Sequence, residues 1–165
     1  MIIEICSIKK ALELAAAARE KTAVISITSL DDRDVEFPGN PHIEAILPMK
    51  FNDLTKEYDE EGIPYGESLP SQADFKGLKI FVDGLSCKHL IVHCWEGTSR
   101  SAAVALAVYE YRGRCDELKT QQRFAPNRLV YALSCRELGI RNAGINDFMV
   151  NSLKVDFGRM EGLSG

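Results

Sequence analysis

The stretch Leu90-Ile91-Val92-His93-Cys94-Trp95-Glu96-Gly97-Thr98-Ser99-Arg100-Ser101 decides the fold, together with the small apolar residues that follow it to Tyr111. Leu90 to Val92 is a short apolar run, which predicts a buried strand. From Arg100 to Tyr111 apolar residues occur on every side, as is typical of a buried helix, and Gly113 is placed to end it. Parallel α/β sheets bind ligands where such a strand meets such a helix. Residues 94–99 are therefore the first candidate for a site.

Strands and helices alternate on both sides of this stretch. Apolar runs predict strands over 2–5, 23–28 and 43–49, and helical spacing predicts helices over 7–19 (capped by Ser7), 71–85, 116–123 and 126–138. This alternation indicates a single-domain α/β fold with a mostly parallel central sheet flanked by helices. We assign residues 1–141 to the domain and 142–165 to a C-terminal tail, in which residues 148–153 favour a short docking helix.

The composition excludes several classes of protein. A length of 165 residues suits one domain, and a net charge of −4 argues against general nucleic-acid binding. No stretch approaches the roughly 18 apolar residues of a membrane helix, so no membrane partner is expected. The N-terminus lacks the pattern of a secretory signal, which predicts a cytoplasmic protein. The five cysteines and three histidines match no zinc or disulfide spacing, so we expect no metal and no cofactor.

Charge is unevenly distributed along the chain. Residues 1–93 hold ten Lys and Arg against sixteen Asp and Glu, whereas residues 94–165 hold ten against eight. Much of the excess lies in residues 52–72, which are acidic and rich in glycine and proline. Loops of this length are uncommon and often functional. The half that contains Cys94 is the less acidic one.

The Cys94 segment has the composition of an anion-binding loop that carries a nucleophile. Gly97 leaves the backbone amides unobstructed, Arg100 offers a planar fork to two oxygens, and Ser101 places a hydroxyl beside the sulfur. Loop amides, the dipole of the following helix and Arg100 all favour a thiolate at Cys94. The chain contains a decoy with the same Cys-to-Arg spacing, Cys135 and Arg141, but no strand precedes it, so we interpret Cys135 as a core residue.

Residues His93 to Ser101 resemble the signature of the protein tyrosine phosphatase superfamily, His-Cys, five residues, Arg, then Ser or Thr. The Glu96-Gly97 pair and the Ser99-Arg100-Ser101 ending are most similar to the dual-specificity branch and its small microbial members. The resemblance extends from about residue 23 to residue 139. Phe51-Asn52-Asp53 resembles the segment that holds this branch's general acid, and Pro126-Asn127 opens a helix much as in the small microbial proteins.

The resemblance implies a role for each site residue. Cys94 would attack phosphorus and form a phosphocysteine intermediate, Arg100 would bind the phosphoryl oxygens, and Ser101 would stabilise the departing thiolate. Asp53 would be the general acid, with Asp59, Glu60 and Glu61 as alternatives. His93 and Asn127 would support the loop, although each also suits a structural role, as core histidine and helix start. The loop residues that would bind phosphate or sulfate are Trp95, Glu96, Gly97, Thr98 and Ser99 together with Arg100.

The resemblance predicts a metal-independent phosphatase of phosphorylated proteins or small phosphate monoesters, most of all phosphotyrosine. Three departures from other branches are clear: no Trp-Pro-Asp loop, no lysine in the Cys94 loop, and a spacing of 41 residues from Asp53 to Cys94, about ten longer than usual in the branch. Two other interpretations stay open. One is a phosphate-binding pseudophosphatase that recognises phosphorylated partners, and the other is a rhodanese-type enzyme that works without an upstream acid.

Overall fold

The computed structural model describes residues 1–55, 60–113, 117–141 and 155–157, the last as backbone. Its centre is one sheet in which every pair of neighbouring strands is parallel, in the order β3-β2-β4-β1-β5-β6. The strands are β1 (Ile2–Ser7), β2 (Thr22–Thr28), β3 (Ile43–Lys50), β4 (His89–Cys94), β5 (Glu117–Thr120) and β6 (Val155–Phe157). The predicted α/β class with a parallel central sheet is confirmed.

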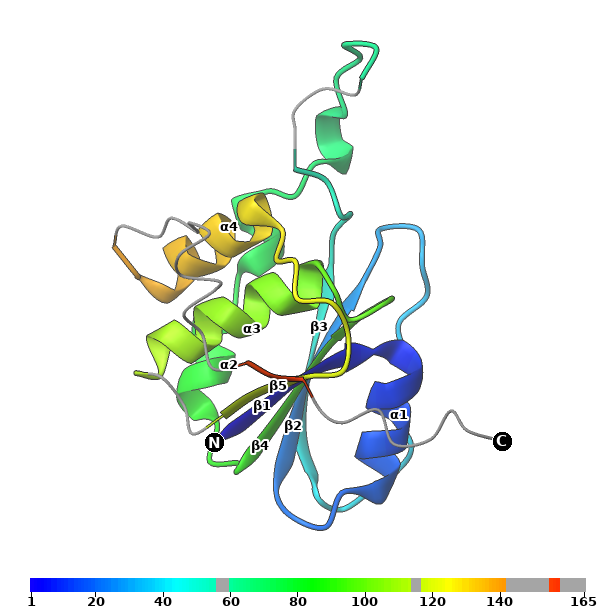
Figure 1. Cartoon of the computed structure of the whole chain (residues 1–165), viewed down its shortest axis with the longest axis vertical. Helices are drawn as coiled ribbons and strands as arrows, with labels where there is room; N and C mark the ends of the chain where they lie inside the picture. Colours follow the sequence, from blue (N-terminus) through cyan, green and yellow to red (C-terminus); the bar gives the residue numbers. More distant parts are fainter. Residues whose placement is uncertain (56–59, 114–116, 142–154, 158–165) are drawn as a thin grey trace.

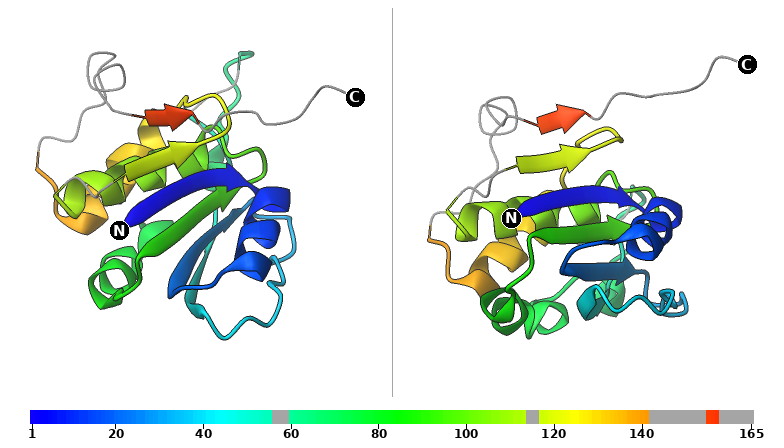
Figure 2. Two further views of the ribbon diagram at one scale, coloured as in Figure 1. Left: turned by 60° about the horizontal axis from the view of Figure 1, so that its bottom comes forward. Right: turned by 90° about the horizontal axis from the view of Figure 1, so that it is seen from below.

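Helices cover both faces of this sheet (Figures 1 and 2). One face carries α1 (Ile8–Ala17), which begins at Ser7, where the Ser7 hydroxyl accepts the Lys10 amide at 3.4 Å as the sequence predicted. The other face carries α2 (Leu78–Gly84), α3 (Arg100–Tyr111) and α4 (Arg128–Leu138). Two short 3-10 helices, η1 (Gly66–Ser68) and η2 (Gln72–Phe75), lie between β3 and α2.

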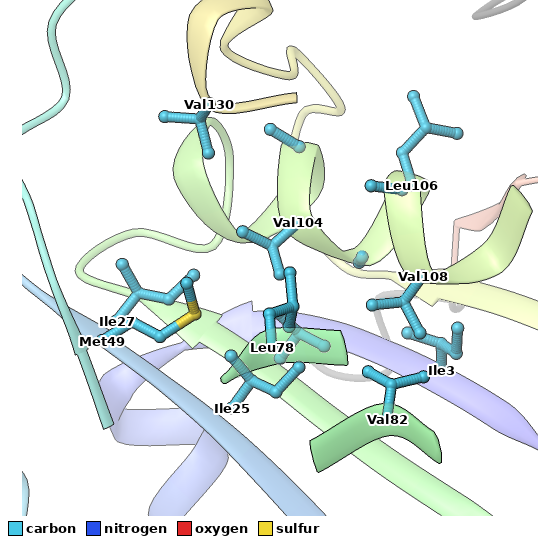
Figure 3. Close-up of a cluster of buried hydrophobic side chains, with 14 of the residues drawn as sticks. Ile3, Ile25, Ile27, Met49, Leu78, Val82, Val104, Leu106, Val108 and Val130 are labelled. Atoms are coloured by element: carbon cyan, nitrogen blue, oxygen red, sulfur yellow. The ribbon is translucent and has the colours of Figure 1, made fainter. Parts of the chain in front are cut away.

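The core is divided between these two faces. Strands β1, β2 and β4 turn alternate side chains toward α3, and the larger cluster there includes the residues labelled in Figure 3, such as Ile3, Ile25 and Val104. The smaller cluster against α1 contains Cys6, Ala11, Ala15, Val24 and Ile91. Helix α3 is buried from Arg100 to Val108, as its all-round apolar pattern predicted. Each fully buried Ile, Val or Leu contributes about 1.5–3 kcal/mol, so this layer holds the Cys94 segment firmly.

One predicted helix is wrong, and another is divided in two. Residues 117–120 form strand β5, not part of a helix over 116–123, because the backbone pairs with β1 and buries Leu118 and Thr120 on alternate positions. The helix predicted over 71–85 is split, because Gly77 takes a left-handed conformation with φ 91° that separates η2 from α2. Helix α4 begins two residues later than predicted, after Asn127 rather than at Pro126.

The tail contributes to the sheet through β6, which pairs with β5 from Leu118↔Val155 to Thr120↔Phe157. The docking helix predicted over 148–153 lies outside the described residues. No helix in the described ranges has the length and apolar character needed to cross a bilayer.

Candidate active site

The candidate site lies where the carboxyl ends of β1, β2, β3 and β4 meet. Helix α1 leaves β1 toward one face of the sheet, and α3 leaves β4 toward the other. The connections that follow β1 and β4 therefore go to opposite faces of the sheet, and open parallel sheets form a crevice at such a point. The Cys94 loop, residues 94–100, occupies this crevice and joins β4 to α3.

Gly97 seats this loop on β1. Its φ of 77° lies in the left-handed region, and a Cβ atom there would stand 2.3 Å from the carbonyl carbon of Cys6 and 2.7 Å from the amide nitrogen of Ser7. Only glycine allows so close an approach of two backbones. A hydrogen bond from the Ile8 amide to the Trp95 carbonyl (3.4 Å) adds to the same contact.

The amides of the loop are left without acceptors. Within the described part of the chain, the backbone N–H groups of residues 95–99 donate no hydrogen bond, and no side chain caps the N-terminus of α3. Gly97 among these residues is buried, and buried backbone donors are almost always paired, so its open amide is unusual. Together with the dipole of a 12-residue helix, the loop amides form an environment that favours an anion.

Arg100 adds a buried positive charge. Its side chain is only 6% exposed, and Nη1 donates to the Ser29 hydroxyl at 3.0 Å and to the Phe51 carbonyl at 2.9 Å. Both acceptors are uncharged, and no carboxylate among the described residues forms a salt bridge with Arg100. Its Nε is buried without a partner. Buried charges are normally paired, so this guanidinium fits a bound anion.

Cys94 and Ser101 are in contact at the bottom of the loop. Their Sγ and Oγ atoms lie 3.2 Å apart, and both residues are buried. His93, on the opposite face of β4, is also fully buried, with Nε2 2.8 Å from the Ser26 hydroxyl and its ring 5.7 Å from that of Phe37. Burial, helped by the charge of Arg100 and opposed by a backbone hydrogen bond with Cys94, lowers the pKa of His93 to about 4. His93 is thus neutral near pH 7 and positions the strand.

Asp53 comes from the end of β3 and lies at the same pocket. Its Oδ1 accepts the Ser99 hydroxyl at 2.8 Å and the Asn127 amide at 2.7 Å. Asn127 also donates to the Leu54 carbonyl (3.1 Å), and its own Oδ1 caps α4 by accepting the Val130 amide (3.1 Å). The Asn127 backbone amide reaches the Ser99 carbonyl at 3.3 Å. Asn127 therefore combines the two roles weighed from the sequence, contacting the loop and starting the helix.

A pocket of about 320 Å³ contains these groups, lined by Ser29, Asp32, Asp53, Cys94, Trp95, Glu96, Thr98, Ser99 and Arg100. Trp95 is 65% exposed, which places it at the rim rather than beneath the loop. Thr98 is half-buried, and its carbonyl accepts the Ala125 amide at 3.1 Å. Of the alternative acids, Glu60 and Glu61 do not line the pocket, and Asp59 lies outside the described residues.

Sequence reasoning missed Ser29 and Asp32. Both follow β2, which lies between β3 and β4 in the sheet. The available signal was their place directly after a fully buried strand, since the carboxyl ends of neighbouring parallel strands meet at one edge. The sequence alone does not show that β2 lies beside β4, and without that strand order the signal could not be used.

The other described cysteines are unsuited to nucleophilic chemistry. Burial raises the pKa of the Cys6 and Cys87 thiols, and it raises that of Cys135 to about 11. Cys135 is fully buried in α4, whereas Arg141 lies beyond the end of that helix and is exposed. The decoy pair therefore forms no site.

Comparison of the chain with models of protein families, with curated proteins and with solved structures found no match. Among the described residues, no group of three or more His, Cys, Asp and Glu side chains is placed to hold a metal ion.

Proposed function

We propose that this protein is a cysteine-dependent phosphatase of the dual-specificity type that hydrolyses phosphate monoesters, phosphotyrosine above all. One observation carries the proposal: Cys94, Arg100 and Asp53 line one pocket, although Asp53 precedes Cys94 by 41 residues and comes from another strand. A nucleophile, an anion-binding cation and a carboxylic acid are the three groups that phosphate monoester hydrolysis requires.

In the first step, the Cys94 thiolate attacks phosphorus and forms an S–P bond. The P–O bond to the leaving group breaks, and Asp53 donates a proton to the leaving oxygen. The phosphoryl oxygens are bound by Arg100 and the amides of residues 95–99, which stabilise the charge of the transition state.

In the second step, water attacks the phosphorus of the phosphocysteine, and the Asp53 carboxylate accepts its proton. The S–P bond breaks, and inorganic phosphate leaves. The departing thiolate is stabilised by the Ser101 hydroxyl, whose oxygen is 3.2 Å from Sγ. The hydrogen bonds from Ser99 and Asn127 hold Asp53 in place for both transfers.

The presence of Asp53 in the pocket favours a phosphatase over a rhodanese-type enzyme, which needs no such acid. The contact between Cys94 and Ser101 favours catalysis over phosphate recognition alone, because binding requires neither a nucleophile nor a stabiliser of its thiolate. The exposed Trp95 gives the rim an aromatic face suited to a phenyl phosphate.

The test is turnover of p-nitrophenyl phosphate with and without EDTA. We expect activity in wild type that EDTA leaves unchanged, and none in Cys94→Ser, which should still bind phosphate or vanadate through Arg100 and the loop amides. Cys135→Ser is the matched control, since that residue lies outside the pocket and should retain activity. Near-normal turnover in Cys94→Ser would exclude the mechanism.

A further inference from the structure

The pocket rim carries two carboxylates for which the proposed chemistry has no use. Asp32 follows β2, Glu96 lies within the Cys94 loop, and both are exposed and line the pocket. They lie at the same opening as Asp53 and the exposed Trp95. Arg100 is the single cation among the nine lining residues. Its side chain is only 6% exposed and lies at the bottom of the site.

These rim carboxylates are not held in ion pairs by the described part of the chain. Neither Asp32 nor Glu96 forms a salt bridge there. Within the described ranges, the Asp32 carboxylate accepts the Ser29 amide, 3.1 Å from Oδ2. Lys50 approaches this loop, but its ammonium contacts the Asp32 carbonyl at 2.7 Å and the Asp34 carboxylate at 3.2 Å.

The segment that leaves β3 extends the negative charge beyond the rim. Residues 60–70 project from the end of the sheet at which β3 terminates (Figure 1). Asn52 ties the base of this segment to the pocket region, donating to the Ser68 carbonyl at 3.4 Å and accepting the Leu30 amide at 3.3 Å. Glu60 and Glu67 in this segment are exposed.

The site thus has opposite charges at two depths. At the bottom, a buried guanidinium with an unpartnered Nε and five open amides favours one phosphoryl dianion. At the rim, carboxylates repel any further negative charge on the substrate and attract positive charge. A polyphosphorylated lipid headgroup or a nucleotide places additional phosphates at that rim, whereas a peptide with lysine or arginine beside the phosphorylated residue places cations there.

We infer that Asp32 and Glu96 are specificity-determining residues that select phosphotyrosine peptides with basic flanking residues and reject polyanionic phosphate esters. The inference rests on the proposed phosphatase function and names its substrate class. One exposed carboxylate acting on one substrate charge across several ångströms of screened solvent changes kcat/KM by roughly two- to threefold at low salt. Two such residues together give a substrate with one flanking cation a preference of roughly four- to ninefold over a neutral substrate.

The experiment compares three phosphotyrosine peptides that differ only in flanking residues: arginine, alanine or glutamate. In wild type at low salt, kcat/KM should fall in that order, and the ratio of the arginine to the glutamate peptide should shrink toward one as salt is added. Asp32→Asn and Glu96→Gln should each lower the ratio of the arginine to the alanine peptide by roughly two- to threefold, and the ratio of the arginine to the glutamate peptide by roughly four- to ninefold. Glu20→Gln is the matched control: it removes one charge at the opposite end of the sheet, where Glu20 pairs with Lys88, and should leave the ratio unchanged.

The result separates this inference from the function on which it rests. Absence of activity on p-nitrophenyl phosphate and on the alanine peptide would overturn the phosphatase itself. Activity on both with a ratio near one at low salt would overturn only the specificity. Faster hydrolysis of an inositol polyphosphate or a nucleotide than of the arginine peptide would likewise overturn it. The salt dependence of wild type decides the question even if a variant fails to fold.

Discussion

Replacing Gly97 by alanine tests whether the contact between the Cys94 loop and β1 positions the site. The added Cβ would lie 2.3 Å, 2.6 Å and 2.7 Å from backbone atoms of Cys6 and Ser7, where ordinary contacts are 3.4–4 Å. Backbone cannot rotate away as a side chain can, so the loop must move from β1 by about 1 Å. That movement would lengthen the hydrogen bond between the Ile8 amide and the Trp95 carbonyl.

The cost has two parts. A left-handed conformation costs an L-residue roughly 1–2 kcal/mol, and overpacking costs typically a further 1–3 kcal/mol. Gly139→Ala isolates the first part, because Gly139 has nearly the same φ (78° against 77°) but nothing within 4 Å of its Cβ position. For a domain of this size each kcal/mol lowers Tm by roughly 2–4 °C. We therefore expect Gly97→Ala to lower Tm clearly more than Gly139→Ala does.

The assay pairs thermal melting with phosphatase kinetics and vanadate binding. A 1 Å displacement of catalytic groups can cost about 10²-fold in rate, so Gly97→Ala should lose about that factor in kcat/KM, whereas Gly139→Ala should stay near wild type. Equal melting temperatures in the two variants, with full activity in Gly97→Ala, would refute the argument that this contact holds the loop.

Four further predictions concern the surroundings of the loop. Asp53→Asn should slow phosphotyrosine hydrolysis by about 10²–10⁴-fold and an activated aryl phosphate much less; similar small losses on both would remove Asp53 as the acid. Asn127→Asp should keep the cap of α4, yet lower both Tm and kcat, because the donor to Asp53 and to the Leu54 carbonyl is replaced by a second carboxylate; unchanged kcat would contradict this. Ser29→Ala removes one of the two hydrogen bonds that hold the Arg100 guanidinium in place, and it should weaken phosphate binding roughly 3- to 10-fold. Ser29→Thr should restore the affinity, as measured by isothermal titration. The pKa of His93 is about 4 in the folded protein and 6.5 ordinarily, so between these values the unfolded chain binds a proton that the folded protein does not. The free energy of unfolding should therefore fall by about 3 kcal/mol as the pH falls from 6.5 to 4. In His93→Gln, urea unfolding should show a weaker dependence on pH over that range.

Local sequence signals predicted the elements that are long or strongly patterned. The fully buried β2 and the all-round buried α3 carry their own apolar signature, and Ser7 marks the start of α1. Strand β5 was not predicted because four residues are too few to show a period of two. Its conformation depends on pairing with the edge of β1. The break at Gly77 was visible as a glycine inside a helical pattern, but its left-handed backbone is a property of the packed chain.

The division of charge along the sequence did not carry over to the pocket. The half with Cys94 is the less acidic half, yet the rim takes Asp32 and Asp53 from the more acidic one. In the sheet β2 lies between β3 and β4, although β3 separates β2 from β4 in the chain, and this order brings the two halves together.

The sequence by itself determined the strand, loop and helix around Cys94, because a buried strand, a left-handed glycine and a buried helix are encoded by residues next to one another. Only the tertiary structure decided which distant groups face the sulfur. Asp53 meets Ser99 across 46 residues and Asn127 across 74, and Arg100 meets Ser29 across 71. Such contacts depend on the order of strands in the sheet and on the packing of α4 against α3, and those are set by the burial of the whole core rather than by any local pattern.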